Sequence, residues 1–149
     1  MFTGKEKLKV KAICLFQQDD YIFVSKSYDK IKKDYYYRPI GGTTEFGEYT
    51  ENTITREIKE ELNAEIKDIK LCRVIENIFT CDGLDGHEIV FLYKADFKDK
   101  KYYEIKEHHI TESNGEKIPV FWIKIEEFLS NRLRLVPEKL TEYIIENAK

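Results

Sequence analysis

The sequence predicts an α/β fold in which helices cover opposite faces of a β-sheet. Segments rich in β-branched and aromatic residues make up most of the chain, and helical patterns occur once early and once at the end. This order does not match a regular βαβ repeat, and it fits a sheet with a helix on each side. At 149 residues the chain is long enough to bury a core, and we expect a single domain over residues 1–149.

The strand-like segments are bounded by polar and glycine-containing turns. The expected strands are residues 8–16, 21–25, 35–40, 69–79, 87–97, 103–105 and 120–125. Two turn signals, Asp82–Gly83 and Asp85–Gly86, separate the two longest strands, and residues 108–117 are expected to form a polar loop.

The first helix is expected over residues 50–63, with Thr50 as its N-cap and Asn63 as a left-handed terminator. The last helix is expected to begin at Pro137, which suits a first helical turn, and to run toward Ala148. Its apolar face consists of Leu140, Tyr143 and Ile144.

Composition and charge favour a soluble globular protein. Hydrophobic residues make up 42% of the chain and charged residues 36%, which excludes a disordered tail protein. The net charge of −3 gives no general electrostatic reason to bind a nucleic acid polymer. Apolar runs such as Ile89–Tyr93 are too short to span a bilayer, and the charged residues near the N-terminus do not resemble a signal peptide.

Three cysteines, Cys14, Cys72 and Cys81, lie in strand-like stretches and include no CxxC pair. We therefore expect buried, reduced thiols and a cytoplasmic location.

The first helix carries an unusual acidic flank. Its aliphatic stripe, within about 80° of arc at 100° per residue, consists of Ile54, Ile58 and Leu62. Glu57, Glu60 and Glu61 lie together beside that stripe. Like charges three or four residues apart destabilise an isolated helix by about 0.2–0.5 kcal/mol per pair, and a divalent cation would reverse the sign of that effect.

The candidate ligands on this helix are all oxygen atoms, which favours a hard cation such as Mg²⁺. Gly41 and Gly42 lie upstream, where the absence of side chains lets the backbone approach a ligand or turn a carbonyl inward. Arg56 lies beside the glutamates and can orient a carboxylate. The alternative is a solvated acidic helix face, but the spacing of seven positions from Gly42 to Glu61 would arise by chance in roughly 1 of 10⁵ such sequences.

Residues 42–64, GTTEFGEYTENTITREIKEELNA, resemble the Nudix box, G-x₅-E-x₇-R-E-U-x-E-E-x-G-U, in which U is aliphatic. Every position matches except the late glycine, where Asn63 stands. Asparagine also accepts left-handed geometry, so the helix end is expected to be retained. A second departure lies upstream, because many family members have proline before the double glycine and this chain has Ile40.

The resemblance implies an α/β/α sandwich around a mixed sheet and hydrolysis of nucleoside diphosphates linked to another moiety, with Mg²⁺ or Mn²⁺. The metal ligands that it implies are Glu57, Glu60, Glu61 and the carbonyl of Gly41. Glu48 would support these ligands or bind through water, and Arg56 would orient the cluster. Water would attack a phosphorus atom while the metal neutralises the phosphate oxygens.

The family places the general base either in the box helix or in a distant loop. Within the helix, Glu57 and Glu60 are candidates. In the loop before the tryptophan strand, Glu112 and Glu116 are candidates, and we select Glu116. A solvated loop glutamate is the alternative reading of Glu116.

Residues near the double glycine are candidates for substrate binding. Arg38 is expected to meet a phosphate, although an exposed structural arginine would look the same. Tyr37 and its tyrosine neighbours can stack on a base, although strand aromatics more often pack in a core. His87 and Glu88 lie on opposite strand faces, so at most one reaches the substrate.

Other functions remain open at this stage. One is a non-catalytic, nucleotide-binding Nudix-like module, although such modules typically lose the metal-binding glutamates. Another is isopentenyl diphosphate isomerase chemistry, which needs a catalytic cysteine and metal-binding histidines not visible here. The expected partner is a small-molecule nucleoside diphosphate derivative, with no nucleic acid polymer and no membrane, and a homodimer is possible. A nucleoside triphosphate, ADP-ribose and a sugar nucleotide are all compatible with the box.

Overall fold

A computed structural model describes residues 6–147. The strands are β1 (Leu8–Leu15), β2 (Gln17–Gln18), β3 (Tyr21–Asp29), β4 (Asp34–Thr43), β5 (Ile66–Cys81), β6 (Leu84–Phe97), β7 (Glu107–Thr111) and β8 (Lys117–Lys124). The helices are α1 (Thr50–Leu62), α2 (Lys101–Glu104), α3 (Ile125–Leu129) and α4 (Lys139–Asn147). None of the helices in this described part of the chain has the length and apolar character needed to cross a bilayer.

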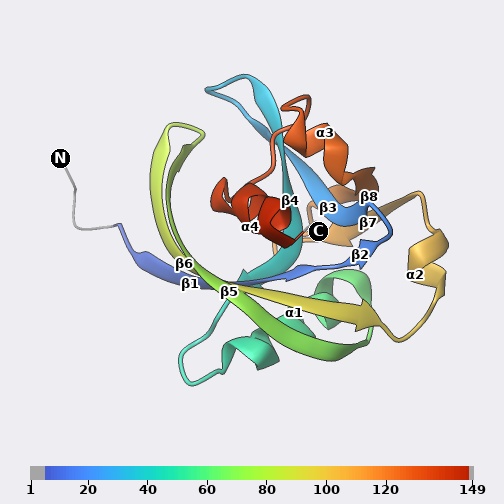
Figure 1. Ribbon diagram of the computed structural model, residues 1–149. Coiled ribbons are helices and arrows are strands. Elements are labelled where there is room, and N and C mark those ends of the chain that lie inside the picture. Colours follow the sequence, from blue (N-terminus) through green and yellow to red (C-terminus); the bar gives the residue numbers. More distant parts are fainter. Residues whose placement is uncertain (1–5, 148–149) are drawn as a thin grey trace.

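The strands form one mixed sheet in the order β5-β6-β1-β4-β3-β8-β7, with β2 paired to β3. β1 and β6 run parallel, and the other neighbours in the order are antiparallel. β5 and β6 form a long curved hairpin with α4 against its concave side, and α1 lies on the other side of the sheet (Figure 1). The sheet therefore has helices on both faces.

Two hydrophobic clusters fill the spaces above and below the sheet. Alternation along β1 sends Ala12 and Cys14 into one cluster and Ile13 and Leu15 into the other. The first cluster contains the stripe of α1: Ile54, Ile58 and Leu62. The second contains α3 and α4 residues: Phe128, Leu140, Tyr143 and Ile144. This arrangement confirms the predicted α/β/α sandwich with a mixed central sheet.

The middle of the sheet opens where β1 and β4 separate. β1 pairs with β4 only over Lys11–Cys14, opposite residues 43–40. Nearer its start, β4 pairs with β3 and forms an isolated parallel bridge between Tyr37 and Leu135. The space between the β1–β6–β5 branch and the β4–β3 branch is the origin of the cleft described below.

The β5–β6 turn consists of Asp82 and Gly83, both with positive φ (53° and 78°), as the aspartate–glycine pair predicts. The second signal does not form a turn, because Gly86 lies within β6 opposite Phe79. A Cβ atom at Gly86 would lie 2.3 Å from the Phe79 ring, so this glycine accommodates an aromatic side chain across the strands.

Two local predictions after β6 were wrong. Residues 103–105, expected to be a short strand, follow the start of α2, in which Tyr102 is buried and packs on Phe97. Residues 108–117, expected to be a polar loop, contribute to the β7–β8 hairpin. β7 lies at the sheet edge, where only Ile110 is buried, so its polar composition concealed the strand.

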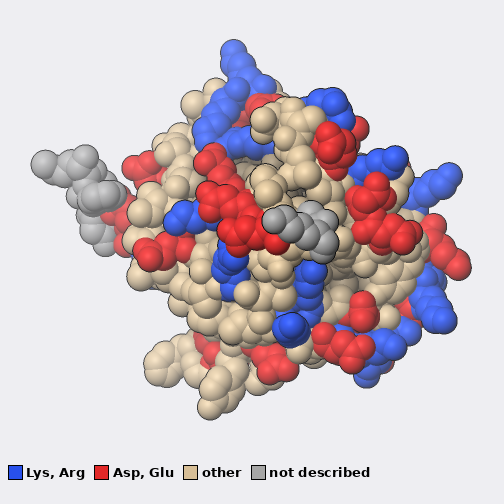
Figure 2. All heavy atoms as spheres, in the orientation of Figure 1, with Lys and Arg blue, Asp and Glu red and all other residues tan. Residues whose placement is uncertain are grey.

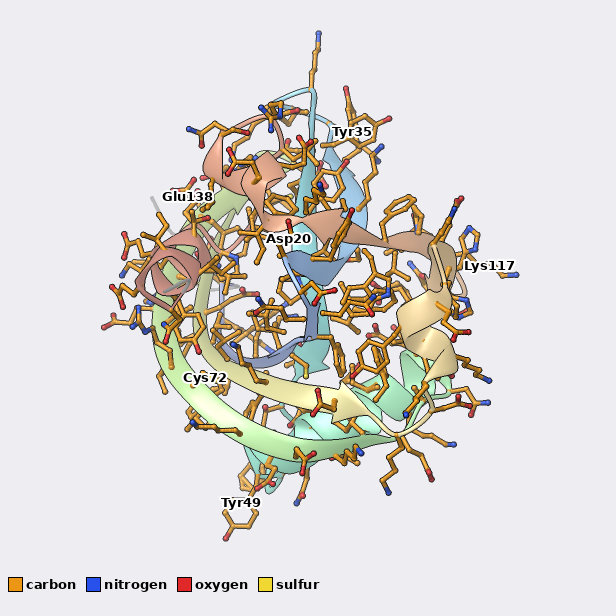
Figure 3. The ribbon with its side chains drawn as sticks, turned by 45° about the vertical axis from the view of Figure 1, so that its right-hand side comes forward. Asp20, Tyr35, Tyr49, Cys72, Lys117 and Glu138 are labelled. Carbon is orange, nitrogen blue, oxygen red and sulfur yellow. The ribbon has the colours of Figure 1, made fainter. Side chains whose placement is uncertain are left out.

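The ends of α1 differ in how well they were predicted. Tyr49, not Thr50, is the N-cap residue, and its side chain makes no capping hydrogen bond. Thr50 is the first helical residue, and its hydroxyl lies 2.6 Å from that of Tyr93. The Tyr49 side chain is 80% exposed and points away from the body of the molecule (Figure 3). Asn63 has φ 55° and ψ 34°, which confirms the left-handed terminator.

The final helix and the cysteines follow the sequence more closely. α4 begins at Lys139, two residues after Pro137, and buries the predicted face of Leu140, Tyr143 and Ile144. The cysteines are free thiols, as expected. Only Cys14 is fully buried, whereas Cys72 and Cys81 are partly exposed, so the expectation of burial was wrong for those two.

We predict that Gly41→Ala lowers the free energy of unfolding by about 3 kcal/mol or more. A Cβ atom at Gly41 would lie 2.0 Å from the Ala12 carbonyl oxygen and 2.7 Å from Ile13 Cα, which are backbone atoms of the paired strand. Urea unfolding measures the loss. Gly115→Ala is the control, because its φ of +83° is unfavourable for alanine but no atom lies within 4 Å, so about 1–2 kcal/mol is expected. Equal losses in the two variants would contradict the steric argument.

Candidate active site

Arg56 joins α1 to the loop that follows β4. Its Nε and Nη2 atoms donate to the two carboxylate oxygens of Glu48 at 2.8 and 3.0 Å, a two-pronged contact. Nη1 donates to Glu57 at 2.8 Å and to Glu60 at 3.4 Å, and Nη2 also reaches the Thr43 carbonyl at 3.2 Å. The guanidinium group therefore fixes the loop and orients two glutamates of the helix.

Glu48 is held on both sides of its carboxylate. Besides Arg56, the Thr53 hydroxyl donates to it at 2.7 Å and the Glu45 N–H at 3.2 Å. The hydrogen bonds from Arg56 and then Thr53 lower the pKa of Glu48 to about 2. Glu48 therefore stays ionised and serves as an anchor for the arginine that orients the helix glutamates.

The double glycine allows β4 to contact both β1 and α1. Gly41 faces the β1 backbone, as described above. A Cβ atom at Gly42 would lie 2.2 Å from the carboxyl carbon of Glu57 and 2.5 Å from its Oε1 atom. The missing side chain of Gly42 thus leaves a cradle that the Glu57 carboxylate occupies.

Glu61 lies in a crowded acidic environment. Burial raises its pKa to about 9, and a hydrogen bond with Glu57 and the negative charge of Glu112 act in the same direction. The positive charge of Arg38 opposes this shift without reversing it. Without a compensating cation, these neighbours favour the protonated form of Glu61.

The donor set suits a hard divalent cation, since Glu57, Glu60, Glu61 and the Gly41 carbonyl offer only oxygen atoms. Within residues 6–147, however, no three acidic, histidine or cysteine side chains converge on one point in the geometry of a metal shell. The reason is that Arg56 draws Glu57 and Glu60 toward itself while Glu61 bonds to Glu57. Binding of a cation would require these side chains to turn toward it, and its charge would favour the ionised form of Glu61.

A cleft of about 1040 Å³ extends from these glutamates into the opening of the sheet. Residues from β1 and β6 form its floor: Lys11, Ile13, Glu88 and Val90. The tips of the β3–β4 and β5–β6 hairpins close its far end, where Lys32 Nζ donates to the Thr80 carbonyl at 2.6 Å and the Lys30 N–H to Asp82 at 2.7 Å. The two hairpin tips can be followed in Figure 1. Acidic and basic side chains are interspersed over the face of the molecule drawn in Figure 2, and acidic ones gather near α4.

The structure brings most of the predicted site residues to this cleft. Those that line it are Arg38, Gly41, Glu57, Glu60 and Glu61. Glu48 and Arg56 lie behind this wall and act through the hydrogen bonds given above.

Two predicted residues do not reach the cleft. Tyr37 is 6% exposed and packs against Phe128 with a ring-centroid distance of 5.8 Å, because alternation along β4 turns Tyr36 and Arg38 toward the cleft instead. Glu116 lies beyond the β7–β8 turn and does not line the cleft, whereas Glu112 does.

Other cleft residues were not singled out from the sequence or were only weighed. Lys11 lies 4.0 Å from Glu88, and burial, followed by the charge of Arg38, lowers the pKa of Lys11. Of the pair His87 and Glu88, only Glu88 lines the main cleft, in agreement with the expected alternation. The sequence around Lys11 indicates only an ordinary strand. It contains no local signal that this strand borders a cleft, so Lys11 was not predicted as a site residue.

Comparisons with known proteins agree with this fold. A family model described as the NUDIX domain matches residues 6–144. A Nudix hydrolase from Nitrosomonas europaea has a TM-score of 0.64 at 17% identity, covering 95% of this chain and 88% of that one. A MutT protein from Bacillus halodurans has a TM-score of 0.59 at 19% identity, covering 91% of this chain and 80% of that one. A search of curated proteins found no match.

The family model covers most of the chain, and the solved structures share its fold, so the class of the protein is defined. The chain belongs to the Nudix family. Nudix hydrolases generally use divalent metal ions, which is consistent with the oxygen donors of α1.

We predict that Glu48→Gln lowers the free energy of unfolding at pH 7, because the amide cannot form the charged two-pronged contact with Arg56. The pKa of Glu48 is depressed in the folded protein from 4.5 to about 2, so its contribution is present above about pH 4.5 and is lost as the pH falls toward 2. Urea unfolding of the wild type and the variant should therefore converge over that range. Glu51→Gln, at an exposed position of α1, is the control. A stability difference that stays constant from pH 7 to pH 2 would contradict this assignment.

Proposed function

We propose that the protein hydrolyses the phosphoanhydride bond of a nucleoside diphosphate linked to another moiety, in a reaction that depends on Mg²⁺ or Mn²⁺. The placement of Glu57, Glu60 and Glu61 together along one cleft carries this proposal. Neighbouring carboxylates repel one another, and a divalent cation bound between them turns that repulsion into attraction. The family match supports the pyrophosphate bond as the target.

Glu57, Glu60, Glu61 and the carbonyl of Gly41 are the groups that would hold the cation. A bound divalent cation supplies neutralisation of the phosphate oxygens and activation of the attacking water. Arg56 sets the orientation of Glu57 and Glu60, and Glu48 in turn fixes Arg56.

Arg38 and Lys11 are the cleft cations nearest the glutamates. The charge of Arg38 acts on both Glu61 and Lys11, and the three side chains line the same cleft. A guanidinium group binds phosphate oxygens in pairs, whereas an ammonium group acts as a point charge. We assign both residues to the diphosphate of the substrate.

Glu112 is the loop residue best placed to accept the proton of the attacking water. It lines the cleft, and its charge acts on Glu61, whereas Glu116 does not line the cleft. We therefore transfer the role proposed for Glu116 to Glu112. The non-catalytic alternative has no support from the site, because none of the box glutamates is missing.

We predict that Glu60→Gln and Glu61→Gln each reduce turnover by several orders of magnitude. The substrates to be screened with Mg²⁺ or Mn²⁺ are a nucleoside triphosphate, ADP-ribose and sugar nucleotides, with phosphate release coupled through a phosphatase. Because glutamine resembles the protonated form of Glu61, Glu61→Gln should keep the wild-type Tm in EDTA near pH 7 and lose the rise in Tm caused by Mg²⁺. Near-normal metal-dependent turnover in both variants would overturn the assignment.

We further predict that Glu112→Gln lowers kcat by about 10²–10⁴-fold with a small change in KM, as expected for loss of a general base. Glu116→Gln is the matched control in the same hairpin and should stay within about twofold of the wild type. Normal kcat in Glu112→Gln would assign the base to α1, and a large loss in Glu116→Gln would restore the original choice.

A further inference from the structure

The arginines of the described chain divide into two groups by their partners. Three form ion pairs with carboxylates: Arg56 with Glu48 and Glu57, Arg73 with Glu146, and Arg132 with Glu127. Across residues 6–147, Arg38 and Arg134 have no carboxylate within 4.0 Å and their side chains donate no hydrogen bond. Both of these arginines line the cleft.

The backbone around Arg134 is fixed on β4. The Tyr37 N–H donates to the Arg134 carbonyl at 2.8 Å, and the Val136 N–H donates to the Tyr37 carbonyl at 2.9 Å. These bonds form the parallel bridge between Tyr37 and Leu135. Because side chains alternate in extended segments, Leu135 enters the core, where it is 4% exposed, and Arg134 faces the cleft.

The bridge also sets the neighbours of Arg134. With Tyr37 opposite Leu135, Arg134 lies alongside Tyr36, and Arg38 lies on the same face two residues further along β4. Neighbouring extended segments are about 4.8 Å apart with a rise of about 3.3 Å per residue, which separates the Cα atoms of Arg38 and Arg134 by about 8 Å. The cleft wall thus carries two unpaired guanidinium groups at different depths.

Arg134 is displaced from the glutamates. Arg38 is three residues from Gly41 along β4, or about 10 Å, whereas Tyr36, beside Arg134, is five residues away, or about 16 Å. Arg38 therefore lies nearer a diphosphate held at the glutamates. Arg134 lies beyond it, toward the hairpin tips, and lines the same cleft of about 1040 Å³.

An unpaired, half-buried arginine in such a cleft has a specific ligand chemistry. Its planar fork of N–H donors matches an oxyanion in a bidentate contact, and partial burial strengthens that contact. We propose that Arg134 binds a second anionic group of the substrate, a phosphate monoester or a carboxylate on the part beyond the scissile diphosphate. Arg134 is then a specificity-determining residue. This assignment rests on the proposed function for the identity of the scissile group.

The experiment uses pairs of diphosphate compounds that differ in one anionic group. Coenzyme A and dephospho-coenzyme A differ by a phosphate monoester, and UDP-glucuronate and UDP-glucose differ by a carboxylate. We expect the wild type to bind the charged member of at least one pair about tenfold or more tightly, measured by calorimetry in EDTA so that no turnover occurs. The phosphate and carboxylate pairs identify which oxyanion the site takes, and the preference should weaken at high salt.

Arg134→Gln should abolish this preference, and Arg134→Lys should restore part of it. Arg132→Gln is the matched control, because Arg132 is two residues away and its partner is Glu127. Kinetically, Arg134→Gln should raise KM for the charged member and leave kcat for the uncharged member unchanged. Loss of the preference in Arg134→Gln alone supports the subsite. Absence of any preference in the wild type, or its retention in Arg134→Gln, would overturn it. A preference in binding without hydrolysis of any compound would remove the proposed function and leave the subsite standing.

Discussion

The guanidinium group of Arg56 is the contact on which the geometry of the site depends. It ties the loop carrying Glu48 to the helix that follows this loop, through contacts with Glu48 and Glu57. Both carboxylates are only about 15% exposed, so water screens these contacts weakly. The contact with Glu60 is longer, at 3.4 Å, and Glu60 is 58% exposed, so that contact adds little stability. Arg56 thus orients Glu57 strongly and Glu60 only weakly.

β4 connects the glutamate site to the rest of the sheet. Gly41 and Gly42 let one strand contact the β1 backbone and the Glu57 carboxylate at consecutive positions. Pairing with β1 then ends after residues 40–43, and the strand continues beside β3 and the segment at Leu135. The cleft is therefore a consequence of strand divergence, and the glutamates lie at the point where the two branches separate.

The sequence predicted the parts of this structure that local spacing determines. The aliphatic stripe of α1, the left-handed Asn63 and the box residues follow from helical periodicity and a fixed motif. The residues that it misplaced depend on register. Tyr36 and Tyr37 are chemically alike, and only the bridge to Leu135 decides which faces the cleft. Glu112 and Glu116 likewise differ only in their position around a turn that was expected to be a loop. Arg134 is more than ninety residues from Arg38 in sequence, so no local pattern relates them.

The cleft has an excess of negative charge near α1 and an unpaired positive charge along the wall that carries Arg134. Near α1, burial and the negative charges of Glu57 and Glu112 disfavour the ionised form of Glu61, and Arg38 compensates them only in part. Along the wall toward the hairpin tips, Arg134 has no carboxylate partner among residues 6–147. The arginine and these glutamates do not pair with each other, because Arg134 lies beside Tyr36, five residues along β4 from Gly41. A single ligand that brings cations to the glutamates and an anion to Arg134 would resolve both, and a metal-bound diphosphate with a second anionic group has that distribution of charge.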